Sequence, residues 1–178
     1  MRVLRMAAMA AAAGLVATGV TAQEAEKPDL RDAEVAHAAV TANAVDVELA
    51  RLALERASDA EVKRFAETMI ADHSSVNEQA AALAKKLGVT PEENAVSRDL
   101  QKGMEEAKAR LQSLRGSAFD VAYMEREVAY HQAVLDALDG LLIPTTENGE
   151  LRDLLTKVRP VIAAHLQHAE KIGARVGR

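Results

Sequence analysis

Apolar residues recur at alternating spacings of three and four along four stretches of this chain, a pattern typical of helices packed in a bundle. The first two stripes are Val35, Ala38, Ala42, Val45, Leu49 and Leu52, then Val62, Ala66, Met69, Val76, Ala80, Leu83 and Leu87. The last two are Val121, Met124, Val128, Leu135 and Leu138, then Leu151, Leu155, Val158, Ile162, Ala169 and Ile172. No comparable run of strict alternation predicts a strand.

The lengths of the links between these helices predict the directions in which the helices run. The tetrad from Ser58 to Glu61 has the form of a capping box, and almost no loop precedes it, so the first two helices should be antiparallel neighbours. The stretch from Gly88 to Gly116 is long enough to return along the bundle, and its own amphipathic helix over 97–115 would span about 28 Å. We therefore predict an all-α, ferritin-like four-helix bundle with a long helical crossover between parallel second and third long helices. A five-helix up-and-down bundle is the alternative.

The beginning of the chain has the form of an export signal. Two arginines precede an apolar run over 6–20, and small residues at 20–22 offer a cleavage site. The run is shorter than a membrane span needs, although an uncleaved anchor is the alternative. We therefore expect residues 1–22 to be a signal peptide, 23–28 a short disordered linker and 29–178 the folded domain. The mature protein would then be periplasmic, without a transmembrane anchor.

Composition restricts the chemistry that is available. The chain has 22 basic and 27 acidic residues, and loss of the two leader arginines leaves 20 against 27, a net charge of −7. An acidic surface argues against nucleic acid and anionic lipid as partners. The absence of cysteine excludes disulfides, thiol catalysis and thiolate metal sites. Metal binding, if present, must use histidine and carboxylate side chains.

Three histidines take the place of aliphatic residues on three different stripes. A single core histidine is usually structural, but buried imidazoles on three converging helices each need a partner, and one bound cation can serve them all. A glutamate at the edge of the first stripe offers a carboxylate from the remaining helix. The predicted metal ligands are Glu48, His73, His131 and His165, with Asp72, Glu127 and His168 as additional candidates.

Four segments carry a family resemblance: Glu48-Leu-Ala-Arg-Leu-Ala, Phe65-Ala-Glu-Thr-Met-Ile-Ala-Asp72-His73, Tyr123 with His131, and His165-Leu-Gln-His168-Ala. Together they resemble an exported bacterial ferritin-like family of unknown function, over about residues 32–172. The resemblance implies a four-helix bundle exported from the cytoplasm, and it implies no established reaction.

The spacing around the histidines differs from that of di-iron carboxylate proteins, which carry Glu-x-x-His on two helices. Here Ile70, Val128 and Ile162 stand three residues before the histidines. The sequence therefore favours zinc or copper over iron, with no metal at all as an equal alternative.

Helical rise predicts two levels within the bundle. His73 and His131 should lie about 21–23 Å from the end where their helices begin, but Glu48 and His165 only about 12 and 8 Å from it. These depths do not place all four ligands at one site. The alternative is that each histidine pairs with a carboxylate across the bundle.

We predict a binding protein whose His/Glu cluster holds a transition metal, and we favour a non-enzymatic role without assigning a catalytic residue. The alternatives are an envelope or stress-associated protein acting through partner surfaces with structural histidines, and a metal-dependent oxidase or hydrolase. Substrate, partner and oligomeric state are not predicted.

Overall fold

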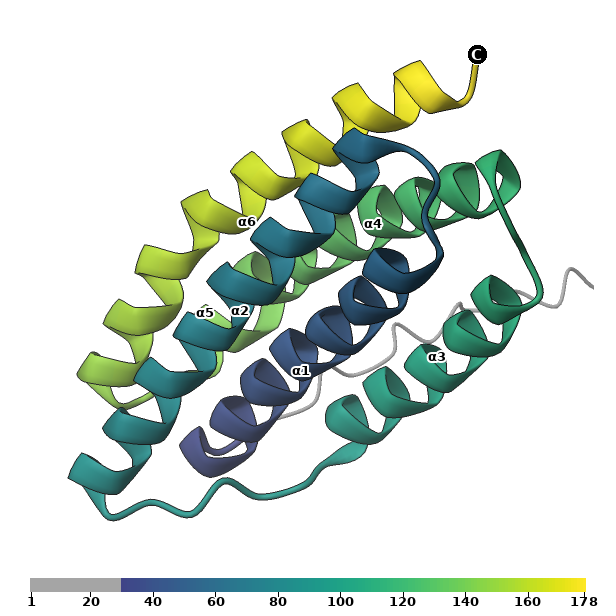
Figure 1. Ribbon diagram of the computed structural model, residues 1–178. Coiled ribbons are helices and arrows are strands. Elements are labelled where there is room, and N and C mark those ends of the chain that lie inside the picture. The colour runs from purple at the N-terminus through teal and green to yellow at the C-terminus, as the bar shows by residue number, and fades with distance from the viewer. Residues whose placement is uncertain (1–29) are drawn as a thin grey trace, which may run out of the picture.

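A computed structural model describes residues 30–178 and shows a helical bundle (Figure 1). Its elements are α1 (Asp32–Arg56), α2 (Ala60–Leu87), α3 (Ala95–Gln112), α4 (Ser117–Ala137), the π-helix η1 (Leu138–Leu142), α5 (Ile143–Thr145) and α6 (Gly149–Val176). No strand occurs within residues 30–178, which agrees with the all-α prediction. The predicted signal peptide over 1–22 and the linker over 23–28 lie outside the described residues.

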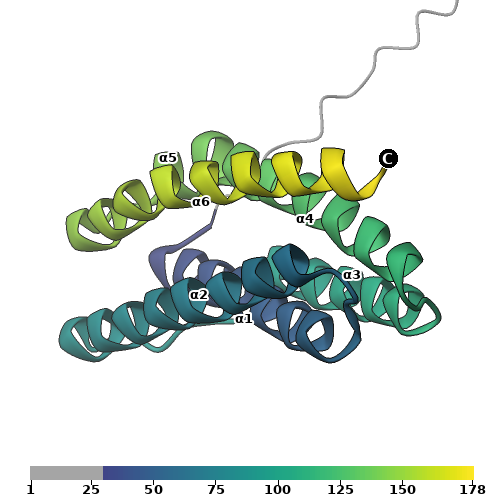
Figure 2. The ribbon, with the colours of Figure 1, turned by 45° about the horizontal axis from the view of Figure 1, so that its top comes forward.

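The helices alternate in direction along the chain (Figures 1 and 2). The helices α1 and α2 lie side by side and antiparallel, α3 returns beside α1, and α4 then runs in the same direction as α2. The last long helix, α6, packs against both α4 and α2. The link containing α3 thus makes α2 and α4 parallel, as its length predicts.

The start of α2 differs from its predicted cap. Asp59, not Ser58, caps the helix, because its carboxylate accepts hydrogen bonds from two N–H groups of the first turn at 2.8 and 3.2 Å. Ser58 is instead engaged by Asp120 of α4, whose carboxylate accepts from the Ser58 N–H at 2.9 Å and from its hydroxyl. This contact ties the α1–α2 turn to the beginning of α4. Gly88, with a φ of 66°, ends α2 as predicted.

The far end of α6 is fixed against the beginning of α2. Pro160 lies inside α6 without ending it, and the helix continues to Val176. Near that end, Arg175 donates to both carboxylate oxygens of Asp59, at 2.9 and 2.6 Å. The hydrogen bonds from Arg175 lower the pKa of Asp59 to about 2. The C-terminal end of α6 is therefore level with the N-terminal end of α2.

The buried apolar residues form two clusters, one toward each end of the bundle. Phe65, Met69, Tyr123 and Met124 belong to the first, and Val35, Leu135, Leu155 and Ile162 to the second. A layer of buried polar side chains lies where the clusters meet, and it includes Asp46, His73, Glu127, His131 and His165. Among the described residues, no helix combines the length and apolarity that a membrane span needs.

Candidate metal centre

Three predicted ligands, His73 of α2, His131 of α4 and His165 of α6, meet in the polar layer. Each offers a potential ligand atom, and these atoms all lie within 4.8 Å of one another. The ring centroids are 5.3 Å apart for His73 and His165, 5.5 Å for His131 and His165, and 5.8 Å for His73 and His131. All three residues are buried, with exposed fractions of 4%, 1% and 6% in chain order.

A chain of amides determines which nitrogen of His73 carries its proton. The Val40 carbonyl can only accept a hydrogen bond, so the Asn77 side chain turns its NH2 group toward it and donates at 3.4 Å. The oxygen of the Asn77 amide then accepts a hydrogen bond from the Asn43 side-chain nitrogen at 3.0 Å. The Asn43 oxygen therefore faces Nδ1 of His73 at 2.7 Å and accepts its N–H. The Nε2 of His73 is left with a lone pair.

The other two imidazoles are oriented in the same manner. His131 donates from Nδ1 to the main-chain carbonyl of Glu127 at 3.0 Å, which leaves a lone pair on its Nε2. His165 donates from Nε2 to the Asp72 carboxylate at 2.9 Å, which leaves a lone pair on its Nδ1. Metal-binding histidines typically donate their second N–H to a carboxylate or carbonyl in this way.

The three remaining nitrogens, Nε2 of His73, Nε2 of His131 and Nδ1 of His165, are buried and have no hydrogen-bond partner in the structure. Burial lowers the pKa of His73 and lowers that of His131 to about 4, so both rings are neutral at pH 7. Burying an unpaired polar atom costs free energy. A cation bound by all three lone pairs would recover that cost.

Two buried carboxylates lie beside the histidines and share one guanidinium. The Nη1 atom of Arg126 donates to Asp46 Oδ1 and to Glu127 Oε1, each at 2.7 Å. Burial raises the pKa of Asp46, but the charged groups around it, Arg126 foremost, outweigh this effect and leave it below its usual value. Burial and the neighbouring Asp46 carboxylate raise the pKa of Glu127 well above normal. Asp46 is therefore the ionised member of the pair.

The other oxygen of each carboxylate, Asp46 Oδ2 and Glu127 Oε2, is buried without a hydrogen-bond partner. The hydroxyl of Tyr123, one turn before Glu127, is unpartnered as well. Asp46, Glu127 and His131 also offer potential ligand atoms within 4.8 Å of one another. The polar layer thus holds two overlapping groups of donors that share His131.

The remaining predicted residues lie outside the converging histidines. Glu48 is at the surface, with 39% of its side chain exposed, and it accepts from Lys108 of α3 at 2.7 Å. His168 is exposed, and its ring lies edge-on to Phe65 at 5.4 Å between centroids. Asp72 is 45% exposed and contacts the centre only through His165. The structure therefore does not bring Glu48 or His168 to the centre, and it gives Asp72 an orienting position.

The prediction that His165 lies at a different level from His73 and His131 is wrong. The predicted depth of about 8 Å from the end where α2 begins is too small. The structure extends α6 to Val176 beside the start of α2, so about 16 Å of helix separates that end from His165. This depth is close enough to those of His73 and His131 for the three rings to meet.

Comparison with known proteins identifies the family but no activity. The family described as "Domain of unknown function (DUF4142)" matches residues 17–172. The chain belongs to this family. No curated protein and no solved structure matches this chain.

Asp46 is the site residue that sequence reasoning missed. A signal for it exists in α1, where Asn43, Asp46, Ala50 and Ala53 follow the spacing 3, 4, 3 and are all buried. This second stripe, adjacent to the apolar one, contains two polar residues and two small ones. Glu48 stands beside Leu49 at the edge of the apolar stripe, but its side chain pairs with Lys108. The carboxylate that α1 contributes is that of Asp46.

Proposed function

We propose that this protein is a periplasmic metal-binding bundle of ferritin-like architecture, in which His73, His131 and His165 hold one transition-metal ion. The observation that carries the proposal is the convergence of three buried imidazoles whose second nitrogens all donate to protein acceptors. Each imidazole therefore presents a lone pair, and none of these lone pairs has a partner. This is the arrangement that orients histidine ligands for a metal.

Asp46 supplies the natural fourth ligand. Its free Oδ2 lies 3.1 Å from the free Nε2 of His73. Two ligands at about 2.1 Å from a tetrahedral ion would stand about 3.4 Å apart, so this separation is close to that of neighbouring ligands. One ionised carboxylate would also offset part of the charge of a divalent ion.

The donor set favours zinc or copper. Three imidazoles and one carboxylate form a nitrogen-rich set that suits both ions. Iron is disfavoured because the Glu-x-x-His pairs of di-iron proteins are absent at all three histidines. The choice between zinc and copper is left to direct metal analysis.

Burial favours binding over turnover. The three histidines are at most 6% exposed, and Asp46 is completely buried. Catalytic zinc sites keep an open coordination position that a substrate or water can reach. A ligand set closed on all sides fits storage, transfer or structural use of the ion. The periplasmic location rests on the export-like pattern over 1–22, and the ferritin-like architecture rests on the crossover through α3.

The test is metal analysis of tag-free protein recovered from its native compartment, followed by calorimetric titration of the metal-free form with Zn²⁺ and Cu²⁺. We expect one ion per chain in the wild type and none after His131→Ala. His37→Ala is the matched control, because His37 lies on α1 and its recorded side-chain partner is Thr41, at 3.5 Å. Wild-type protein that binds neither ion would contradict the proposal.

A further inference from the structure

The second donor group, Asp46, Glu127 and His131, already contains a cation belonging to the protein itself. One nitrogen of Arg126 lies 2.7 Å from an oxygen of each carboxylate. A zinc-like ion bound to the same two oxygens would lie 2.0–2.2 Å from each, so it would need the space that this nitrogen occupies. The guanidinium and a second dication therefore cannot share this position.

Arg126 is held in place from its outer side. Its guanidinium carbon lies 3.9 Å from the centroid of the Tyr130 ring, and the Tyr130 hydroxyl donates to the Ala42 carbonyl of α1 at 2.8 Å. Only 15% of the Arg126 side chain is exposed, while both carboxylates are fully buried. The planar fork is thus fixed between an aromatic ring and two carboxylates.

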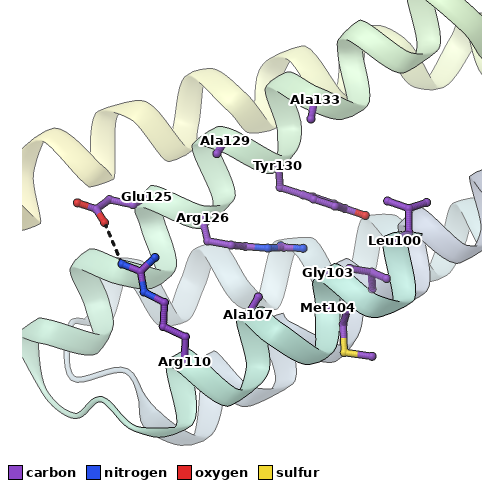
Figure 3. A pocket seen from close by; sticks show the side chains of 11 residues that line it. Leu100, Gly103, Met104, Ala107, Arg110, Glu125, Arg126, Ala129, Tyr130 and Ala133 are labelled. Carbon is purple, nitrogen blue, oxygen red and sulfur yellow. Dashed lines mark ion pairs between the residues drawn. The ribbon is translucent and has the colours of Figure 1, made fainter. Parts of the chain in front are cut away.

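A groove of about 490 Å³ lies beyond this arginine, between α3 and α4, and Val45 of α1 also lines it. Figure 3 shows Arg126 and Tyr130 side by side along its wall, with Arg110 and Glu125 at a separate edge. Arg126 therefore separates the groove from Asp46 and Glu127. Truncation of its side chain would leave both carboxylates without their cation and facing this space.

We propose that Arg126 occupies a second cation position and thereby restricts the centre to one metal ion. This inference rests on the proposed function at His73, His131 and His165. The second position would take a divalent transition-metal ion through Asp46 Oδ1 and Glu127 Oε1, the two oxygens that Arg126 contacts. The other oxygens of these carboxylates, Oδ2 and Oε2, are buried without hydrogen-bond partners. Arg126 thus prevents formation of a pair of ions bridged by carboxylates, and with it the two-ion chemistry that such pairs support.

The test counts zinc ions per chain by native mass spectrometry and elemental analysis, with zinc in excess over protein. We expect one ion in the wild type and two in Arg126→Met and Arg126→Gln. The double variant Arg126→Met with Glu127→Gln should return to one, because it lacks a carboxylate of the second position. Arg110→Met is the matched control, since Arg110 lines the same groove and its recorded ion pair is with Glu125, at 3.9 Å.

Two ions in the wild type, or one ion in a folded Arg126→Met or Arg126→Gln protein, would overturn the inference and leave the proposed function intact. No ion in the wild type would instead contradict the proposed function itself. Circular dichroism establishes that each variant is folded. The glutamine variant keeps a hydrogen-bond donor in place, so it covers the case in which the methionine variant fails to fold.

Discussion

Nε2 of His73 and Oδ2 of Asp46 lie 3.1 Å apart in the buried layer, and neither atom has a hydrogen-bond partner. Because His73 donates from Nδ1 to Asn43, its Nε2 presents a lone pair toward an ionised carboxylate. Two facing acceptors repel each other unless a cation or a proton lies between them. Their arrangement is therefore unfavourable in the empty protein and becomes favourable when a metal is bound.

The first prediction compares Asp46 with Glu48, both of which are carboxylates of α1. Asp46→Asn should weaken zinc binding at least 10-fold, because the amide carries no charge to offset that of the ion. Glu48→Gln should leave the affinity unchanged, since Glu48 is at the surface and pairs with Lys108. Competition titration with a chelator of known affinity measures both. Equal losses in the two variants would return Glu48 to the ligand set.

The second prediction separates a binding role from a structural role for His131. His131→Leu should leave the metal-free protein as stable or more stable, because it removes a buried nitrogen that has no partner. The same variant should lose the rise in Tm that zinc produces in the wild type. Thermal unfolding with and without zinc gives both quantities. His168→Leu, at an exposed position outside the centre, should keep the zinc-dependent rise. A less stable His131→Leu protein that keeps the full rise would indicate a structural histidine.

The third prediction concerns the residue that orients His165. Asp72→Ala removes the acceptor of the Nε2–H group, so the ring is free to change tautomer and rotate. Zinc affinity should fall about 10- to 100-fold, the usual cost of losing such an orienting partner. Unfolding free energy should change by no more than about 0.5 kcal/mol, because the Asp72 side chain is half-exposed. Glu78→Ala, an exposed change on the same helix, serves as the control. Unchanged zinc affinity in Asp72→Ala would refute the orienting role.

The fourth prediction is a pH dependence of the metal-free protein. Burial lowers the pKa of His131 to about 4, whereas an unfolded histidine titrates near 6.5. At a pH between these two pKa values, the His131 ring is protonated in the unfolded state but not in the folded state. The free energy of unfolding must therefore fall as the pH drops through this range. His131 alone contributes roughly 3 kcal/mol to this loss, and His73 acts in the same direction.

Urea unfolding of chelator-treated protein between pH 7 and pH 4 measures this loss. His131→Leu is the reference, because it retains every other titrating group and should show a smaller fall in stability. Asp59 does not disturb the comparison, because both proteins keep it and its pH-dependent contribution is the same in each. Parallel curves for the wild type and the variant would show that His131 is not neutral in the fold.

The helical bundle was predictable from the sequence because it depends on local periodicity. The same periodicity pointed to His73, His131 and His165 as site residues. A histidine on a three-four stripe must face the bundle interior, whatever the exact helix ends are. The match in level between His73 and His131 also followed, because their helices begin at the same end of the bundle and run in parallel. The position of His165 did not follow, because it depends on where α6 ends, and the Arg175–Asp59 contact that marks this end joins distant parts of the chain.

The carboxylates were harder to predict because adjacent helix positions differ by about 100° in direction. Asp46 and Glu48 are two residues apart and both border the apolar stripe of α1, so the large apolar residues alone do not show which of them is buried. The role of Arg126 depends on two carboxylates brought together from α1 and α4. No spacing within a single helix encodes that contact. The amide chain through Asn43 and Asn77 likewise joins α1 to α2 and appears only in three dimensions.

The most direct measurement is anomalous diffraction from crystals of the protein loaded with zinc, recorded on both sides of the zinc absorption edge. We predict one anomalous peak per chain, about 2.0–2.1 Å from Nε2 of His73, Nε2 of His131 and Nδ1 of His165. The Arg126 guanidinium should remain between Asp46 and Glu127. A zinc-loaded crystal without a peak among these three nitrogens, or with its zinc bound only at surface residues such as His168, would contradict the account.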